Sequence, residues 1–323
     1  MEDKKNTWLV IVNPHAGSKK GERDWPEIRR LLKNAGIKTH CVFSERPYHA
    51  MEITRNHIEK KGFEKIIVVG GDGTLNEVIN GIFMQRRIKT QDVTVGMISV
   101  GTGNDWGRMY EMPESYTEQV KLLTNGHKFL QDVGKATFRF SGDKQERYFI
   151  NIAGMGYDAL VAEKANIMKQ KGKGGPVSYL VNVVSGLFQY KSVHLDIHAD
   201  GKHLFSGKVF TMSIGICKYN GGGMMQLPDA VPDDGLLDIT IIRKTTKYRI
   251  VTNIKNLYDG SFVKMREVEQ FIGKKITVSS RPIHKLYLET DGESLGHSPL
   301  NFEVIPKAIR VMVKKSSNQK QNT

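Results

Sequence analysis

The sequence IIVVGGDGTLNEVINGIF, residues 66–83, contains the transition that decides the fold of the first part of this 323-residue chain. Its first four residues form a β-branched run without alternation, which is typical of a parallel strand buried on both faces. From Leu75 to Ile82 the apolar residues recur at i, i+3, i+4 and i+7, the spacing of one helix face. The stretch therefore predicts a strand, a glycine turn and a helix N-terminus in direct succession.

The turn Gly70-Gly71-Asp72-Gly73 is suited to bind an anion. Free N–H groups and the helix dipole point at such a turn, and glycines let a phosphate approach the backbone. The turn matches neither G-x-x-x-x-G-K-[ST] nor G-x-G-x-x-G, and its carboxylate repels bare phosphate. A magnesium ion between Asp72 and the phosphate resolves that conflict, so we expect a magnesium-bound nucleotide here. The alternative is a tight connection without a ligand.

GGDGTLNEV, residues 70–78, resembles the nucleotide-binding signature of the diacylglycerol kinase catalytic family. That family includes bacterial soluble lipid kinases and is related to sphingosine and ceramide kinases. A looser GGDG resemblance extends to NAD kinases and phosphofructokinases. The resemblance implies nucleotide contacts from the whole element, that is from Gly70, Gly71, Asp72, Gly73, Thr74, Leu75, Asn76 and Glu77.

Two further loops follow predicted buried strands, at residues 8–12 and 93–100. Loops at the carboxyl ends of parallel strands line the ligand crevice of a doubly wound sheet, so these loops and the glycine turn should face one ligand. VNPHAGS, residues 12–18, and GTGND, residues 101–105, resemble two other elements of the same family. The resemblance implies nucleotide contacts from Asn13, Ser44, Thr102 and Asn104, and a catalytic role for Asp105 beside Asp72.

Element order predicts an α/β protein with two domains. Residues 25–35 and 50–61 have helical patterns, a strand is expected at 40–43, and Ser115 with Glu118 has the form of a capping box. Residues 1–128 should therefore form a doubly wound, mostly parallel nucleotide-binding domain. Strand-like runs then dominate, the first of them at 129–133, 136–140 and 148–152. With helical stretches at 159–169 and 179–188 between the later runs, they predict a mainly antiparallel, sandwich-like β-rich domain over 129–313. Residues 314–323 form a polar tail.

The segment Gly154-Met-Gly-Tyr-Asp-Ala159 fits G-x-G-x-x-A and favours an oxidoreductase. A ribose-binding acid should follow about 20 residues later, and GKGGPVSYL in that region has none. The segment also resembles the one that joins the two domains in the lipid kinases.

Two carboxylate-rich motifs lie in the second half. PDAVPDDGLLD, residues 228–238, can supply a hard oxygen cage for magnesium, and its resemblance to the family implies a structural metal held by Asp234 with the carbonyls of Val231 and Leu236. DGE, residues 291–293, resembles the family's last motif, in which a carboxylate acts as the base. Asp291 and Glu293 are both candidates, and we slightly favour Asp291 because it directly follows a strand.

The chain has 48 basic and 34 acidic residues, a net charge of +14, which favours an anionic partner. Because nucleic-acid signatures are absent, we expect an anionic membrane surface rather than nucleic acid. The basic loop 169–175 is either a contact to lipid headgroups or a plain flexible loop, and the sequence does not decide between them. No apolar run reaches the ~18 residues of a membrane span, and no signal peptide is evident, so we expect a cytoplasmic, peripherally membrane-associated protein. Cys41 and Cys217 should be reduced thiols. The sequence does not decide whether the protein is a monomer or a homodimer.

The resemblance of these motifs, in this order, implies an ATP-dependent kinase that phosphorylates the hydroxyl of diacylglycerol or a related lipid. ATP and magnesium would lie between the two domains, and phosphoryl transfer would depend on alignment and charge neutralisation. An NAD kinase-like enzyme and a nonenzymatic anionic-membrane or nucleic-acid binder are the alternatives.

Overall fold

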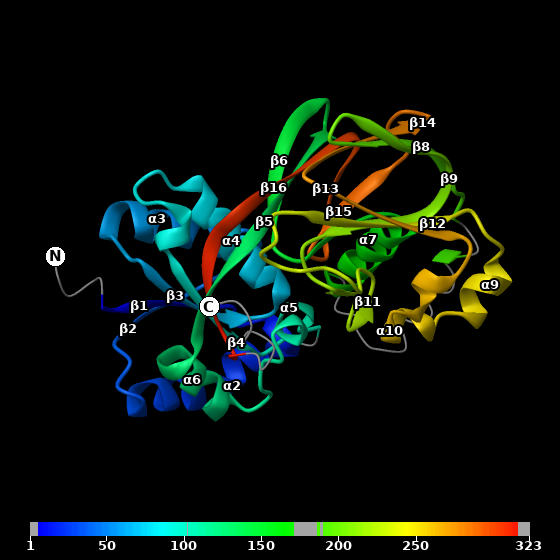
Figure 1. The fold of residues 1–323 in the computed structure, drawn as a ribbon. Coiled ribbons are helices and arrows are strands. Elements are labelled where there is room, and N and C mark those ends of the chain that lie inside the picture. The colour runs from blue at the N-terminus through cyan, green and yellow to red at the C-terminus, as the bar shows by residue number, and fades with distance from the viewer. Residues whose placement is uncertain (1–5, 102, 171–185, 188–189, 316–323) are drawn as a thin grey trace. The chain divides into compact units, whose positions relative to one another are not determined.

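A computed structural model describes residues 6–101, 103–170, 186–187 and 190–315. It divides into two compact units (Figure 1). Unit 1 comprises Met1–Val133 and Pro306–Thr323, and unit 2 comprises Gly134–Ile305. Strands β5 and β16 each contribute residues to both units.

Unit 1 is built on a parallel sheet with the strand order β2-β1-β3-β4-β16. Its elements are β1 (Trp8–Val12), α2 (Ala16–Asn34), β2 (Thr39–Phe43), α3 (His49–Asn56), a π-helical turn (His57–Lys61), β3 (Lys65–Gly70), α4 (Asp72–Met84), a 3-10 turn (Thr90–Asp92), β4 (Thr94–Ser99), α5 (Asp105–Met109), α6 (Tyr116–Asn125), the first part of β5 (His127–Phe140) and the last part of β16 (Glu293–Val313).

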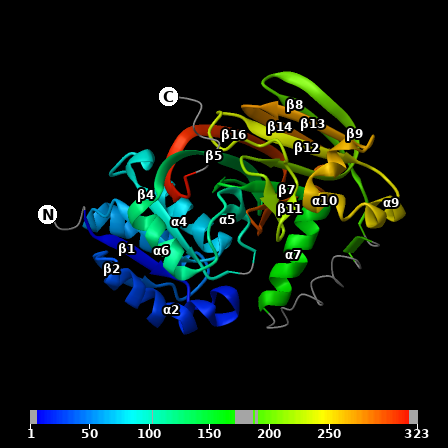
Figure 2. The ribbon, with the colours of Figure 1, turned by 60° about the horizontal axis from the view of Figure 1, so that its bottom comes forward.

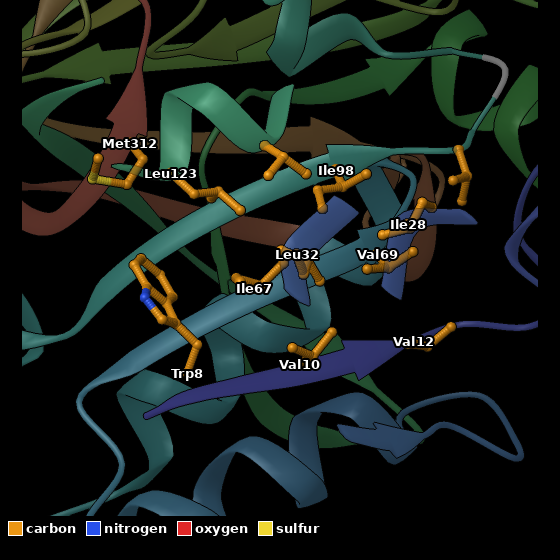
Figure 3. Close-up of a cluster of buried hydrophobic side chains, with 12 residues drawn as sticks. Trp8, Val10, Val12, Ile28, Leu32, Ile67, Val69, Ile98, Leu123 and Met312 are labelled. Atoms are coloured by element: carbon orange, nitrogen blue, oxygen red, sulfur yellow. The ribbon is translucent and has the colours of Figure 1, made fainter. Parts of the chain in front are cut away.

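Helices cover both faces of this sheet. Alternate residues of β1 and β3, such as Val10 and Ile67, pack with Ile28 of α2 and Leu123 of α6 in one buried cluster (Figure 3). Helix α3 packs against α4, and α4 against β3 (Figure 1). The burial pattern of β3, without alternation, reflects coverage on both faces. The predicted doubly wound, mostly parallel sheet is confirmed.

The predicted start of the first helix is corrected by the structure. Helix α2 begins at Ala16 rather than near residue 25, but Gly17, Ser18 and Lys19 have left-handed backbone angles and kink its first turn. A Cβ atom on Gly17 would lie 1.9 Å from the Val100 carbonyl oxygen, so only glycine fits there. The predicted capping residue Ser115 does cap α6, because its Oγ accepts the Glu118 N–H at 3.3 Å.

Unit 2 is mainly antiparallel. Its elements are the end of β5, β6 (Asp143–Phe149), β7 (Ile152–Gly156), α7 (Tyr157–Gln170), β8 (Val193–Ala199), β9 (Lys202–Gly215), β10 (Tyr219–Asn220), β11 (Met224–Met225), β12 (Leu237–Arg243), α9 (Lys247–Thr252), α10 (Asn256–Asp259), a 3-10 turn (Ser261–Lys264), β13 (Val268–Gly273), β14 (Lys275–Arg281), β15 (Tyr287–Thr290) and the first part of β16. Antiparallel pairings connect β13, β12, β9, β7, β15 and β16 in that order.

Two predicted elements of the second half are corrected. The runs expected at 129–133 and 136–140 form one strand, β5, and the run expected at 148–152 is split between β6 and β7. The split occurs because the N–H groups of Ile150 and Asn151 are bound by the Asp291 carboxylate. Most of the predicted helix 179–188, residues 171–175 of the basic loop, and residues 316–323 of the tail lie outside the described residues. Cys41 and Cys217 are free thiols, and Cys217 is buried.

Candidate active site

Four loops of unit 1 begin side by side at the carboxyl edge of the parallel sheet. The strand ladder continues one step into three of them, those after β1, β2 and β4, through hydrogen bonds from Asn13 N to Val69 O, from Ser44 N to Val12 O, and from Val100 N to Gly70 O, each 2.9 Å. The loops with predicted nucleotide contacts are therefore held next to one another, as a ligand crevice at this edge requires.

Glycines let two of these loops approach closely at the start of α4. A Cβ atom built on Gly101 would lie 2.8 Å from the Gly71 Cα, whereas one built on Gly73 would meet no atom within 4 Å. The N-cap residue of α4 is Gly71, which has no side chain that could cap the helix. A glycine N-cap and the free space at Gly73 leave room for a phosphate at the first turn of α4.

Asp72 and Asp105 lie together beside this helix start. Asp72 accepts the backbone N–H groups of Asp105 and Trp106, both at 3.2 Å. A Cβ atom on Gly103 would lie 3.1 Å from one Asp72 oxygen and 3.8 Å from one Asp105 oxygen, so both carboxylates border the same glycine. Burial raises the pKa of Asp72, and the N–H groups of Trp106 and Asp105 oppose that rise. Two adjacent carboxylates next to a phosphate position are suitable ligands for magnesium.

Two amide side chains complete this edge. Asn13 Nδ2 donates to Thr74 Oγ1 at 2.9 Å and thereby ties the loop after β1 to the first turn of α4. Asn104 has a left-handed backbone at the start of α5, and its buried Oδ1 has no hydrogen-bond partner among the described residues. An unpartnered buried oxygen is costly, so a ligand donor at this position would stabilise the loop.

Most of the other predicted nucleotide contacts are buried or hydrogen-bonded within the protein. Leu75 and Asn76 are buried, and Asn76 accepts a hydrogen bond from Asn80 at 3.0 Å. Glu77 accepts the N–H groups of Tyr48 and Ala50, each at 3.0 Å, so it fixes the start of α3. Ser44 is buried, and Thr102 lies outside the described residues.

In unit 2, Asp291 anchors the turn between β15 and β16. Its carboxylate accepts the backbone N–H groups of Ile150 at 3.0 Å and of Asn151 and Ile152 at 3.1 Å. Asp291 itself has a left-handed backbone, with φ of 48°, and is largely buried. The three amide donors occupy the carboxylate oxygens and hold the turn against the chain before β7.

Glu293 lies at the first position of β16 and is more accessible than Asp291. Its Oε1 is 3.0 Å from Nη2 of Arg147, an ion pair in which the Glu293 side chain is 20% exposed. One carboxylate of the DGE motif is thus bound to the backbone, and the other is paired to a side chain. The two predicted candidates for the base differ clearly in their surroundings.

A buried carboxyl pair, Asp158 and Glu289, is a feature that sequence reasoning missed. Glu289 Oε2 accepts the Gly292 N–H at 2.8 Å, and Oε1 accepts Asn220 Nδ2 at 3.0 Å. Burial and then repulsion from Asp158 raise the pKa of Glu289 to about 8, and burial raises that of Asp158 to about 6. A glutamate within the strand-like run LYLET, residues 286–290, was the available signal.

The two glycines of the G-x-G-x-x-A segment lie against side chains of the protein, Gly154 against Glu289 of this pair and Gly156 against Tyr190. A Cβ atom on Gly154 would lie 2.4 Å from Glu289 Oε1, and one on Gly156 would lie 2.9 Å from the Tyr190 hydroxyl. Gly156 also has φ of +79°. Both glycines make room for side chains of the protein itself, so the structure gives no support to a dinucleotide site at this turn.

The predicted metal loop follows β11. Asp234 Oδ1 accepts the Leu236 N–H at 2.9 Å, and both Val231 and Asp234 are exposed. Burial, then repulsion from Asp234 and Asp229, raises the pKa of Asp238 to about 6. The described residues contain no group of three His, Cys, Asp or Glu side chains arranged to hold a metal. A site here would need backbone carbonyls besides Asp234, and the crowded carboxylates fit a cation.

No helix among the described residues is long and apolar enough to cross a bilayer.

Comparisons with known proteins match both halves of the chain. Residues 7–136 match the diacylglycerol kinase catalytic domain, and residues 151–313 match the YegS C-terminal NAD kinase beta sandwich-like domain. A diacylglycerol kinase of Staphylococcus carnosus is 30% identical over 307 residues, which cover 95% of this chain and 94% of that protein.

Solved structures agree with the fold. A structure from Bacillus anthracis str. Sterne has a TM-score of 0.75 at 26% identity and covers 96% of both chains. A diacylglycerol kinase structure from the same organism has a TM-score of 0.69 at 22% identity, covering 96% of this chain and 97% of that chain. The predicted fold class and family resemblance are confirmed, and the chain belongs to the diacylglycerol kinase family.

Proposed function

We propose that this protein is an ATP-dependent kinase that transfers the γ-phosphoryl group to the hydroxyl of diacylglycerol or a closely related lipid. The observation that carries the proposal is the glycine-lined start of α4, where Gly71 and Gly101 nearly touch and the carboxylates of Asp72 and Asp105 lie together. Anion-binding backbone beside metal-binding carboxylates is what phosphoryl transfer from a magnesium nucleotide requires.

In this proposal the phosphates lie against the first N–H groups of α4, and Asn13 and Asn104 contribute polar contacts. Asp72 and Asp105 would hold magnesium, which neutralises phosphate charge and aligns the γ-phosphoryl group. The lipid oxygen forms a bond to the γ-phosphorus while the bond from phosphorus to the β,γ-bridging oxygen breaks, and ADP leaves. The hydroxyl proton passes to a carboxylate.

We assign that proton transfer to Glu293 and a positioning role to Asp291. Asp291 has three amide donors on its carboxylate, which occupy its oxygens and fix the turn. Glu293 is the more accessible carboxylate of the motif, and its ion pair with Arg147 orients it. A positioned general base contributes about 10²- to 10⁴-fold to such a step.

The test is ATP turnover with diacylglycerol, sphingosine, NAD or no acceptor. We expect ADP release and a phosphorylated lipid with diacylglycerol, dependent on magnesium. Phosphorylation of NAD alone would establish the NAD kinase-like alternative, and absence of turnover with every acceptor would refute the proposal.

A further inference from the structure

Helices α9 and α10 lie along one edge of unit 2 (Figure 2). These helices and the turn between them carry exposed apolar side chains. Tyr248, Val251, Ile254 and Tyr258 are 78%, 50%, 36% and 55% exposed. Their spacing of three, three and four residues places them on one side of a helix. The hydrogen bonds Asn253 N to Arg249 O and Leu257 N to Ile254 O, both 3.2 Å, continue the helical path between α9 and α10.

The opposite side of this segment holds it to unit 2. Ile250 packs against the buried cluster of Tyr157, Leu187 and Phe210. After α10, a Cβ atom on Gly260 would lie 3.0 Å from both Met225 Sδ and Pro228 Cβ, so the chain at Gly260 packs closely against these two residues. The outward apolar side chains therefore contribute little to the core of the unit, and their exposure is unexplained by folding.

The same segment is strongly basic. Residues 244–266 contain six basic residues and one acidic residue. Arg249 and Arg266 form ion pairs with Glu267 at 2.7 and 2.9 Å. Lys244, Lys247, Lys255 and Lys264 are exposed. Exposed aromatic and aliphatic side chains among lysines are typical of helices that lie in the interface of an anionic membrane.

We propose that this surface, made by Tyr248, Val251, Ile254, Tyr258 and the adjacent lysines, docks unit 2 on an anionic phospholipid bilayer. The inference rests on the proposed function, since a lipid kinase must take its substrate from a membrane. Nucleic acid would use the lysines but leave Val251 and Ile254 without a role. A second copy of the chain would need roughly 20 residues a side for a stable interface, more than this surface supplies.

The experiment measures co-sedimentation of the full-length protein with vesicles of phosphatidylcholine, with and without phosphatidylglycerol. One variant combines Tyr248→Ser and Val251→Ser, and a second combines Lys244→Gln, Lys247→Gln and Lys255→Gln. The control combines Ile272→Ser and Ile283→Ser, because these side chains are 59% and 64% exposed elsewhere in unit 2. Thermal melts establish that each variant is folded.

We expect wild type and control to bind the anionic vesicles equally. Each lysine near an anionic surface strengthens binding about fivefold, so the triple lysine variant should bind about 10²-fold more weakly. The apolar variant should bind at least about tenfold more weakly. All four proteins should phosphorylate a short-chain, water-soluble diacylglycerol at the same rate, while the two surface variants lose turnover on long-chain diacylglycerol in vesicles.

Vesicle binding by either surface variant at the wild-type level would overturn the proposal, as would failure of wild type to bind anionic vesicles. If the surface variants keep vesicle binding but lose duplex DNA binding that wild type has, the surface binds nucleic acid instead. If they keep vesicle binding but lose a dimer that wild type forms in sedimentation, the surface is an interface between two copies of the chain. If wild type does not phosphorylate the short-chain lipid, the proposed function fails, and the vesicle arm still decides the docking surface.

Discussion

Glu289 and Gly292 are joined by a hydrogen bond of 2.8 Å from the Gly292 N–H to Glu289 Oε2, so an interior acid holds the turn that carries Asp291. The other oxygen of Glu289 accepts a hydrogen bond from the Asn220 side chain. The residue before it, Tyr219, is held as well, because its carbonyl oxygen accepts a hydrogen bond from Asn151 Nδ2 at 2.7 Å. The DGE turn is thus supported by a buried polar network rather than by its own residues alone.

Glu289 should make stability depend on pH. Its pKa in the folded protein is about 8, raised by burial and by Asp158, with Asp291 adding a smaller repulsion. Below the ordinary carboxyl pKa both folded and unfolded chains hold this proton, and between that value and about 8 only the folded chain does. Stability is therefore highest at the acid end of this window and falls as the pH rises to about 8.

The Glu289→Gln variant should lack this decline, because the amide cannot ionise. Urea unfolding between pH 5 and 8 measures it: the variant should lose a slope of up to about 1.4 kcal/mol per pH unit. Glu146→Gln is the control, since Glu146 is half-exposed and only 3.7 Å from Lys135. The Tyr190 hydroxyl, whose pKa burial and Asp158 raise, faces the pair but titrates above this range. Parallel pH curves for wild type and Glu289→Gln would contradict the assignment.

Asp72→Asn should lower turnover by at least about 10²-fold, because charge at the phosphate position is lost. The amide also replaces an acceptor of the Asp105 and Trp106 N–H groups, so we expect about 1–2 kcal/mol lower stability without unfolding. Steady-state kinetics and a thermal melt separate the two effects. Near-normal turnover would remove Asp72 from the mechanism.

Gly71→Val should weaken ATP binding while the protein stays folded. A Cβ atom at Gly71 meets only the Gly101 Cα, at 3.4 Å, so the added methyl groups would extend into the open position proposed for phosphate. Calorimetric titration with ATP, with a melt as the folding control, measures the effect. Unchanged ATP affinity would argue against a phosphate site at the start of α4.

Local sequence patterns predicted the parts of the fold that short-range rules govern. The strand Trp8–Val12 has the predicted bounds, and the change from β3 to α4 occurs at the predicted glycines. The neighbouring loops could be predicted as well, because the carboxyl ends of parallel strands meet at one edge. Patterns of this kind identify an element but not its distant partners.

Long-range contacts were not predictable in this way. Asp158 and Glu289 are brought together by the pairing of β15 with β7, which no motif encodes. The return of β16 to unit 1 depends on the pairing of Arg310 with Thr94, again between distant segments. Helices α9 and α10 are too short to be recognised from hydrophobic periodicity in the sequence. Their outward apolar residues do not pack in the core, so a pattern that assumes a buried apolar face does not identify them.

Asp291→Asn and Glu293→Gln should have different effects. Asp291→Asn places an amide N–H against one of three backbone donors, so we expect a loss of at least about 2 kcal/mol in stability. Glu293→Gln should lower kcat by about 10²-fold or more with the KM for ATP unchanged. Glu303→Gln, on the same strand β16, is the control. If Glu293→Gln has the kcat of wild type, Glu293 is not the base, and Asp291 or Asp105 becomes the candidate for that role.

Asp234→Ala should remove a response to magnesium. In the absence of the ion, the substitution relieves repulsion on Asp238 and breaks only the hydrogen bond to Leu236 N, so stability should change little. A bound ion at 100 times its Kd would add about 2.7 kcal/mol, and only proteins with Asp234 should gain it. Thermal melts with magnesium and with EDTA measure this, and Asp229→Asn, which retains Asp234, should still respond. Equal shifts for wild type and Asp234→Ala would place the ion elsewhere.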